Sequence, residues 1–141
     1  MKTAWKISVQ LLSANAVIFI CIAAGSLLPS FWGDTGGRDF IPQTFNAGIL
    51  ILLVSFMIRS RFKWPGLHMI LYLIPSQFII LFCMSYYSGY SLYQLFSSFD
   101  YFYDFLQWLL LFDIFIAVPW IIGVLTGTLL LRIKKQIENY D

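Results

Sequence analysis

The sequence is poor in charge, and this absence narrows the class of protein. Only 11% of its 141 residues are charged and 60% are apolar, whereas a soluble domain carries about 25% charge. A soluble fold needs more polar surface than this, so most of the chain must face lipid. The sequence also lacks a basic patch large enough to follow a nucleic acid, and its length predicts one domain, residues 1–141.

Cysteine and histidine are also scarce. Cys21 and Cys83 lie in different apolar runs outside any CxxC pair, which favours two buried thiols over a redox pair or a disulfide. His68 has no acid or cysteine near it in sequence, which favours a hydrogen-bonded residue at the membrane interface over a titrating or metal-binding one. Residues 33–39 are rich in glycine but lack the Gly-Lys-Ser/Thr ending of a phosphate loop. We expect no metal, no cofactor and no catalytic activity.

Four apolar runs predict four transmembrane helices. They cover about residues 7–28, 43–58, 64–87 and 108–131. The first run is about 33 Å long as a helix, which is more than the core of a signal peptide, so a span is favoured over a cleaved leader. The second run is the weakest, because polar residues occupy its outer end.

Basic residues set the orientation of these helices. The turn Arg59–Gly66 puts three cations and a Pro-Gly pair between two apolar runs, and it belongs on the cytoplasmic side. With this turn inside, eight bases lie inside and Arg38 alone lies outside. The eight are Lys2, Lys6, Arg59, Arg61, Lys63, Arg132, Lys134 and Lys135. Both termini are therefore predicted to be cytoplasmic.

The stretch between the third and fourth predicted spans is unusually aromatic. Apolar residues at three- and four-residue steps predict an amphipathic helix over about 92–106. We expect this helix to lie along the outer membrane surface, either as the ordered cap of a helical hairpin or as a platform for a partner. On the platform interpretation, the candidate outer contacts are Phe96, Phe99 and Tyr103.

Two polar residues are candidates for a pocket within the membrane. Gln77 follows the predicted kink at Pro75, and Asp113 lies in the fourth span. Asp113 is near the outer end of that span if the span begins at Leu111, and it is buried by about two turns if the span begins at Phe105. Hydrogen bonding between helices is favoured over a pocket that binds a ligand.

The last span carries the small-residue pattern Gly123-x-x-x-Gly127. Glycines at this spacing let another helix approach closely. The pattern predicts tight helix packing and is a weaker indication of dimers.

The sequence as a whole predicts an all-α membrane protein with four transmembrane helices and an interfacial helix. Its expected function is that of a non-catalytic accessory, binding or protective (immunity-like) protein in the cell membrane, with a bacterial cytoplasmic membrane favoured. The expected partners are the lipid bilayer and another membrane protein, or a second copy of the chain. The alternative is an oligomeric transporter or channel component with Asp113 as its intramembrane acid. A lipid- or thiol-directed enzyme would have only His68, Arg59 and Arg61 near the cytoplasmic headgroups, and it is least favoured.

Overall fold

The structure, a computed structural model, describes residues 2–28, 40–78, 97 and 99–139. Every regular element in these ranges is an α-helix: α1 (Lys2–Leu27), α2 (Phe40–Arg61), α3 (Gly66–Leu71) and α6 (Phe99–Glu138), with a further helical stretch at 73–78. The prediction of an all-α chain is confirmed for this part of the sequence. Residues 29–39 of the predicted first loop (29–46), the third span beyond residue 78, and Cys83 lie outside the described residues.

Three helices are long and apolar enough to cross a membrane. These segments are Thr3–Leu27, Thr44–Arg61 and Leu109–Glu138, of 25, 18 and 30 residues. They fall on the first, second and fourth of the predicted spans. About 20 residues of helix cross the hydrocarbon core, so each of the three is near or above the required length.

The third predicted span is broken within its first half. Pro75 predicts a kink in a span that opens at Trp64. The structure has a break close to this position: α3 begins at Gly66, ends at Leu71, and is followed by a turn at Tyr72. Pro65 takes the N-cap position, with an extended ψ of 123°. The break precedes Pro75 because proline has no N–H for the carbonyl of Leu71 and its ring collides with that carbonyl.

The last helix is longer than predicted. The sequence separated an interfacial helix ending near residue 106 from a span starting near 108, but α6 runs without interruption from Phe99 to Glu138. The predicted boundary is wrong because no glycine or proline occurs between Phe99 and Val118 to stop the helix. Its 40 residues correspond to about 60 Å, which is twice the thickness of the hydrocarbon core. Residues 92–96 and 98, which include the predicted start of the interfacial helix, are outside the described ranges.

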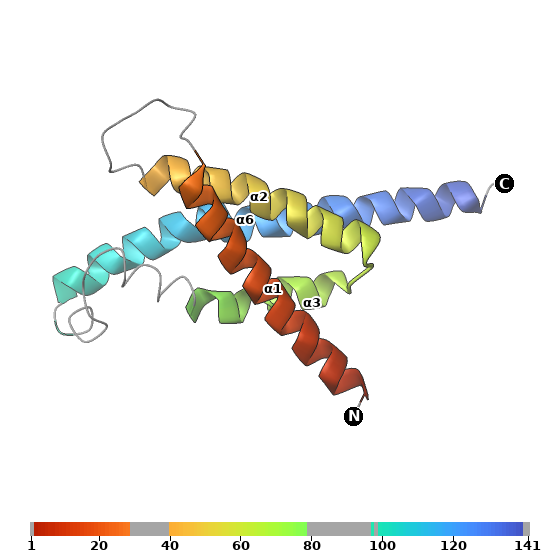
Figure 1. The fold of residues 1–141 in the computed structure, drawn as a ribbon, viewed down its shortest axis with the longest axis horizontal. Helices are drawn as coiled ribbons and strands as arrows, with labels where there is room; N and C mark the ends of the chain where they lie inside the picture. Colours follow the sequence, from red (N-terminus) through yellow and green to blue (C-terminus); the bar gives the residue numbers. More distant parts are fainter. Residues whose placement is uncertain (1, 29–39, 79–96, 98, 140–141) are drawn as a thin grey trace.

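The helices pack around α6 and α2. These two lie side by side and run in the same direction, α3 returns in the opposite direction, and α1 crosses them obliquely (Figure 1). The largest interface joins α2 to α6, the next joins α1 to α2, and a smaller one joins α3 to α6. The buried apolar core takes residues from each of them, among which Ile18, Ile51, Met69, Ile116, Trp120 and Val124 are almost completely covered.

Candidate functional site

Gln77 and Asp113, predicted as a candidate pocket, are in direct contact. The side-chain amide Nε2 of Gln77 donates a hydrogen bond of 2.8 Å to the carboxylate Oδ1 of Asp113, at a partly buried position. Gln77 comes from the helical stretch 73–78 and Asp113 from α6. The bond therefore ties the segment after the Pro75 break to the last helix. A carboxylate has about four acceptor sites, so the bond from Gln77 leaves room at Asp113 for a cation or further donors.

The glycines of the small-residue pattern lie in the α2–α6 interface of this chain. A Cβ added at Gly123 would collide with the hydroxyl of Ser55 and would lie 2.5 Å from the carbonyl oxygen of Leu52. A Cβ at Gly127 would lie 2.9 Å from Cβ of Arg59. Real Cβ atoms do not approach other atoms this closely, so glycine is what allows the two helices to touch. The described packing uses this face within one chain.

The aromatic candidates at the start of α6 are exposed. Phe99 is 80% exposed and Tyr103, one turn later, is 55% exposed. Because they are four residues apart on a helix, they share one face. Phe96, the third predicted outer contact, lies outside the described residues.

A polar cluster around the break in the third segment was not predicted as a unit. The indole Nε1 of Trp120 in α6 donates to the carbonyl of Met69 at 2.8 Å. The hydroxyl of Tyr72 donates to Oε1 of Gln10 at 3.2 Å, and the amide of Asn15 makes a long bond of 3.5 Å to the carbonyl of Tyr72. Side chains of α1 and α6 thus bind backbone groups beside the break. Pro75 is the sequence signal for free carbonyls here, but no pattern in the sequence identifies their donors.

Two polar atoms of the same region have no hydrogen-bond partner among the residues that the structure describes. They are Oδ1 of Asn15 and Nδ1 of His68, both buried. His68 lies beside Tyr72, with ring centroids 6.3 Å apart. His68, predicted as a hydrogen-bonded residue at the interface, is therefore partly buried and packed against an aromatic neighbour, with no hydrogen bond to Nδ1 from the described residues.

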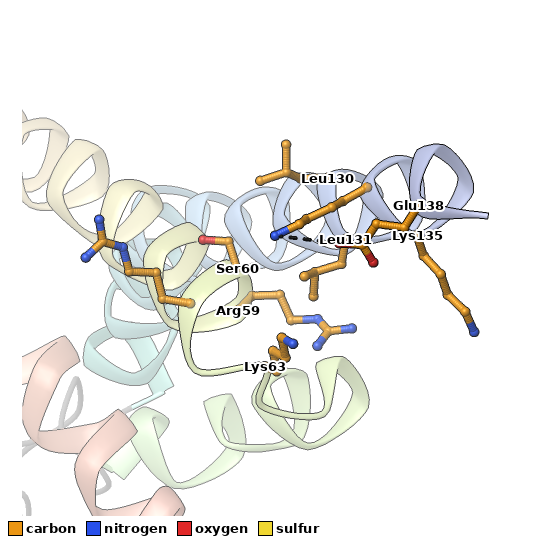
Figure 2. Close-up of a pocket in the computed structure, with 9 residues that line it drawn as sticks. Arg59, Ser60, Lys63, Leu130, Leu131, Lys135 and Glu138 are labelled. Carbon is orange, nitrogen blue, oxygen red and sulfur yellow. Dashed lines mark ion pairs between the residues drawn. The ribbon is translucent and has the colours of Figure 1, made fainter. Parts of the chain in front are cut away.

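A cleft lined by basic residues lies where the C-terminal ends of α2 and α6 meet. We call it the basic cleft; its volume is about 750 Å³. Its lining residues are Arg59, Ser60, Arg61, Lys63, Leu130, Leu131, Lys134, Lys135 and Glu138 (Figure 2). The distribution of basic residues predicts one side of the membrane for these cations, but no pattern in the sequence predicts that the turn after α2 and the end of α6 come together.

The described residues offer little for metal chemistry, and comparison with known proteins adds no functional clue. Within the described ranges, no group of three or more His, Cys, Asp or Glu is placed to hold a metal ion. No family model, curated protein or solved structure matches this chain. The case for function therefore rests on the geometry above.

Proposed function

We propose that this chain is a four-span membrane protein with both termini in the cytoplasm, and that it acts as a non-catalytic accessory protein of another membrane protein. A bacterial cytoplasmic membrane is the proposed location. In this arrangement residues 64–87, the third predicted span in chain order, cross the membrane in addition to the three long apolar helices.

The arrangement of cations supports the proposed topology. Bases from the turn after α2 and from the end of α6 line one cleft, so they lie on the same side of any membrane that the helices cross. The directions of the helices agree with this, because α2 and α6 run in parallel and α3 runs against them (Figure 1). Parallel α2 and α6 require one returning segment between them, which residues 64–87 would supply.

The observation that carries the accessory role is that polar side chains in the helices bind one another. Gln77 binds Asp113, Trp120 binds the Met69 carbonyl, and Tyr72 binds Gln10. Hydrogen bonds of this kind hold membrane helices together. Polar groups used in this way give a self-supporting bundle, which suits a protein that presents a surface to a partner.

The proposed contact surface is the exposed aromatic face at the start of α6. Counting about 20 residues back from Leu131, the last apolar residue before Arg132, puts the outer edge of the hydrocarbon core near residue 112. Phe99 and Tyr103 then lie about 13–20 Å beyond that edge. Aromatic side chains are enriched at protein interfaces, and two of them on one exposed face outside the lipid are best covered by the outer part of a partner membrane protein.

The test is recovery of a stoichiometric partner with the tagged protein from membranes dissolved in mild detergent. Replacing Phe99 and Tyr103 together by Ala is expected to reduce this recovery at least about tenfold, since buried aromatic contacts contribute about 2 kcal/mol or more each at such sites. The matched control replaces Leu129 and Ile133 together by Ala. These two residues are exposed and one turn apart near the other end of α6, and their replacement should leave recovery of the partner unchanged. Equal losses from both pairs, or a pure homo-oligomer, would refute the proposal.

A second candidate is an oligomeric transporter or channel component. It is favoured by one observation, the partly buried Asp113 carboxylate, which accepts a hydrogen bond from Gln77 in the helical stretch that follows the break at Tyr72. Carboxylates inside membrane segments often bind the transported proton or cation. Reconstituted in vesicles, Asp113→Asn should abolish such a flux, whereas it should leave partner recovery unaltered if the accessory role is correct.

A further inference from the structure

The basic cleft combines a strong excess of positive charge with an apolar wall. Its lining contains five cations and one carboxylate, so the formal excess is four positive charges. The carboxylate of Glu138 is 3.9 Å from Nζ of Lys134 on the exposed surface of the same helix, and such pairs are weak. The cleft therefore keeps most of its attraction for an anion.

The position of the cleft matches the boundary between hydrocarbon and headgroups. Leu130 and Leu131 in its wall are the last residues of the apolar run of α6, and Arg132 follows directly. Arg59 and Lys63 lie near each other at one end, with Leu131 beside them, and Lys135 lies farther along α6 (Figure 2). A ligand here would contact cations and aliphatic side chains at once, which suits an amphiphile better than a free anion.

Arg59 is held in place within this cleft. Its Nε donates to the hydroxyl of Thr128 at 2.8 Å and its Nη1 donates to the carbonyl of Trp64 at 2.8 Å. A guanidinium has five N–H donors, so two bonds to the protein fix its orientation and leave three for a ligand. A fixed guanidinium binds a phosphate with less loss of entropy than a mobile one.

Lys63 has an unusual backbone conformation. Its φ is +53°, in the left-handed region that favours glycine. Lys63 lies two residues beyond the end of α2 at Arg61. The N–H of Phe62 still bonds to the carbonyl of Ile58, so Lys63 is the first residue outside the helical hydrogen bonding, where glycine is the usual residue. The left-handed conformation is less favourable for lysine than for glycine, and the lysine adds a cation to the rim of the cleft.

We propose that the basic cleft binds the phosphate headgroup of an anionic phospholipid in the cytoplasmic leaflet, with the upper part of its acyl chains against Leu130 and Leu131. The proposal relies on the orientation given under Proposed function, though it does not depend on a protein partner. Basic pockets between helices at this level bind anionic headgroups in general, and a volume of about 750 Å³ is within the usual range of small-molecule sites.

The experiment titrates the full-length protein in neutral detergent with dioleoylphosphatidylglycerol and counts bound lipid by native mass spectrometry. Dioleoylphosphatidylcholine is the neutral comparison lipid, and inorganic phosphate is the soluble competitor. We expect preferential binding of phosphatidylglycerol that weakens with added salt. Replacing Arg61 and Lys135 together by Gln should weaken it about tenfold or more.

The matched control is Lys2→Gln with Lys6→Gln, which removes two cations from the N-terminal end of α1, outside the cleft. It should change the affinity for phosphatidylglycerol by less than about twofold, because headgroup contacts are local while general surface charge is not. Lys63→Gly is a third variant that removes one cleft charge while relieving the left-handed backbone. It should weaken lipid binding without lowering the thermal unfolding midpoint, so it keeps the test valid if the double variant misfolds.

Equal losses in the cleft and control variants would mean that only general surface charge attracts the lipid, and would overturn the proposal. Displacement of phosphatidylglycerol by an equal concentration of inorganic phosphate would identify a soluble-anion site and would also overturn it. Because binding in detergent needs neither membrane orientation nor a partner, a failed partner assay leaves this result standing.

Discussion

Trp120 shows how a single side chain compensates for a broken helix. The turn at Tyr72 interrupts the helical hydrogen bonding of the third segment, and the indole of Trp120 binds the Met69 carbonyl in its place. Both residues are completely buried. A buried carbonyl without a donor costs about 1–3 kcal/mol. The indole therefore contributes more to the stability of the fold than the burial of its apolar surface alone.

We therefore expect Trp120→Phe to lower the free energy of unfolding by about 1–3 kcal/mol. The phenyl ring retains most of the apolar contact but cannot donate to Met69. The measurement is unfolding in mixed micelles with increasing SDS, followed by circular dichroism. Trp64→Phe is the control, since the hydrogen bond at Trp64 is accepted by its backbone carbonyl and not made by its ring; equal losses for the two variants would contradict this explanation.

At the scale of elements, the α2–α6 interface depends on small residues in both helices. Gly123 lies against Leu52 and Ser55, while a Cβ at Gly48 of α2 would be 2.7 Å from the carbonyl oxygen of Phe115. Pro119 lacks the N–H that would normally bond to that carbonyl. The close approach of Gly48 thus occurs at the point where α6 has lost an internal hydrogen bond.

Gly123→Ala is expected to destabilise the protein by about 1–3 kcal/mol, as overpacking does in other interiors. Alanine favours a helix over glycine by about 0.5–1 kcal/mol, so a net loss means that the collision with α2 outweighs the gain. Gly127→Ala should cost less, because its nearest neighbour is the Cβ of Arg59 at 2.9 Å. The thermal unfolding midpoint in detergent measures the loss of stability in both variants. Gly66→Ala is the control, since the atoms nearest to a Cβ added at Gly66 are 3.5 Å away. A stabilising Gly123→Ala would contradict the packing described.

The elements differ in how far the sequence predicts them. Apolar length is a local property, so the spans at 7–28, 43–58 and 108–131 are found without a structure. The glycine pattern predicts close packing, and Gly123 and Gly127 do touch α2, but a pattern within one helix does not identify its partner. The break at Tyr72 has a local signal in Pro75. The contact between Gln77 and Asp113 depends on how residues 36 positions apart meet, which periodicity does not encode. The separation predicted between 92–106 and the span at 108–131 is wrong, because aromatic amphipathicity indicates a helix but no breaker between Phe99 and Val118 ends it.

At the scale of the whole molecule, the number of crossings is the property to measure first. Four crossings require both termini on one side, whereas three would separate them. We expect a C-terminal fluorescent protein to fluoresce in the cytoplasm and alkaline phosphatase inserted between Gly36 and Gly37 to be active outside.

The two fusions distinguish the alternatives because each reporter functions on one side only. An N-terminal tag that is retained and stays cytoplasmic would agree with α1 as a span, while its loss would indicate a cleaved leader. An active phosphatase at the C-terminus would contradict the four-span topology and would mean that residues 64–87 do not cross the bilayer.

The parallel pairing of α2 with α6 also has a consequence for biosynthesis. The chain leaves the ribosome from its N-terminus, and 77 residues follow Arg61 before Glu138 is made, which takes about 4–15 s at ordinary rates of translation. Until that synthesis is complete, α2 lacks the helix that covers Ser55 and supplies Thr128 to Arg59. Among the described helices, the largest interface is therefore completed only when the end of the chain is made.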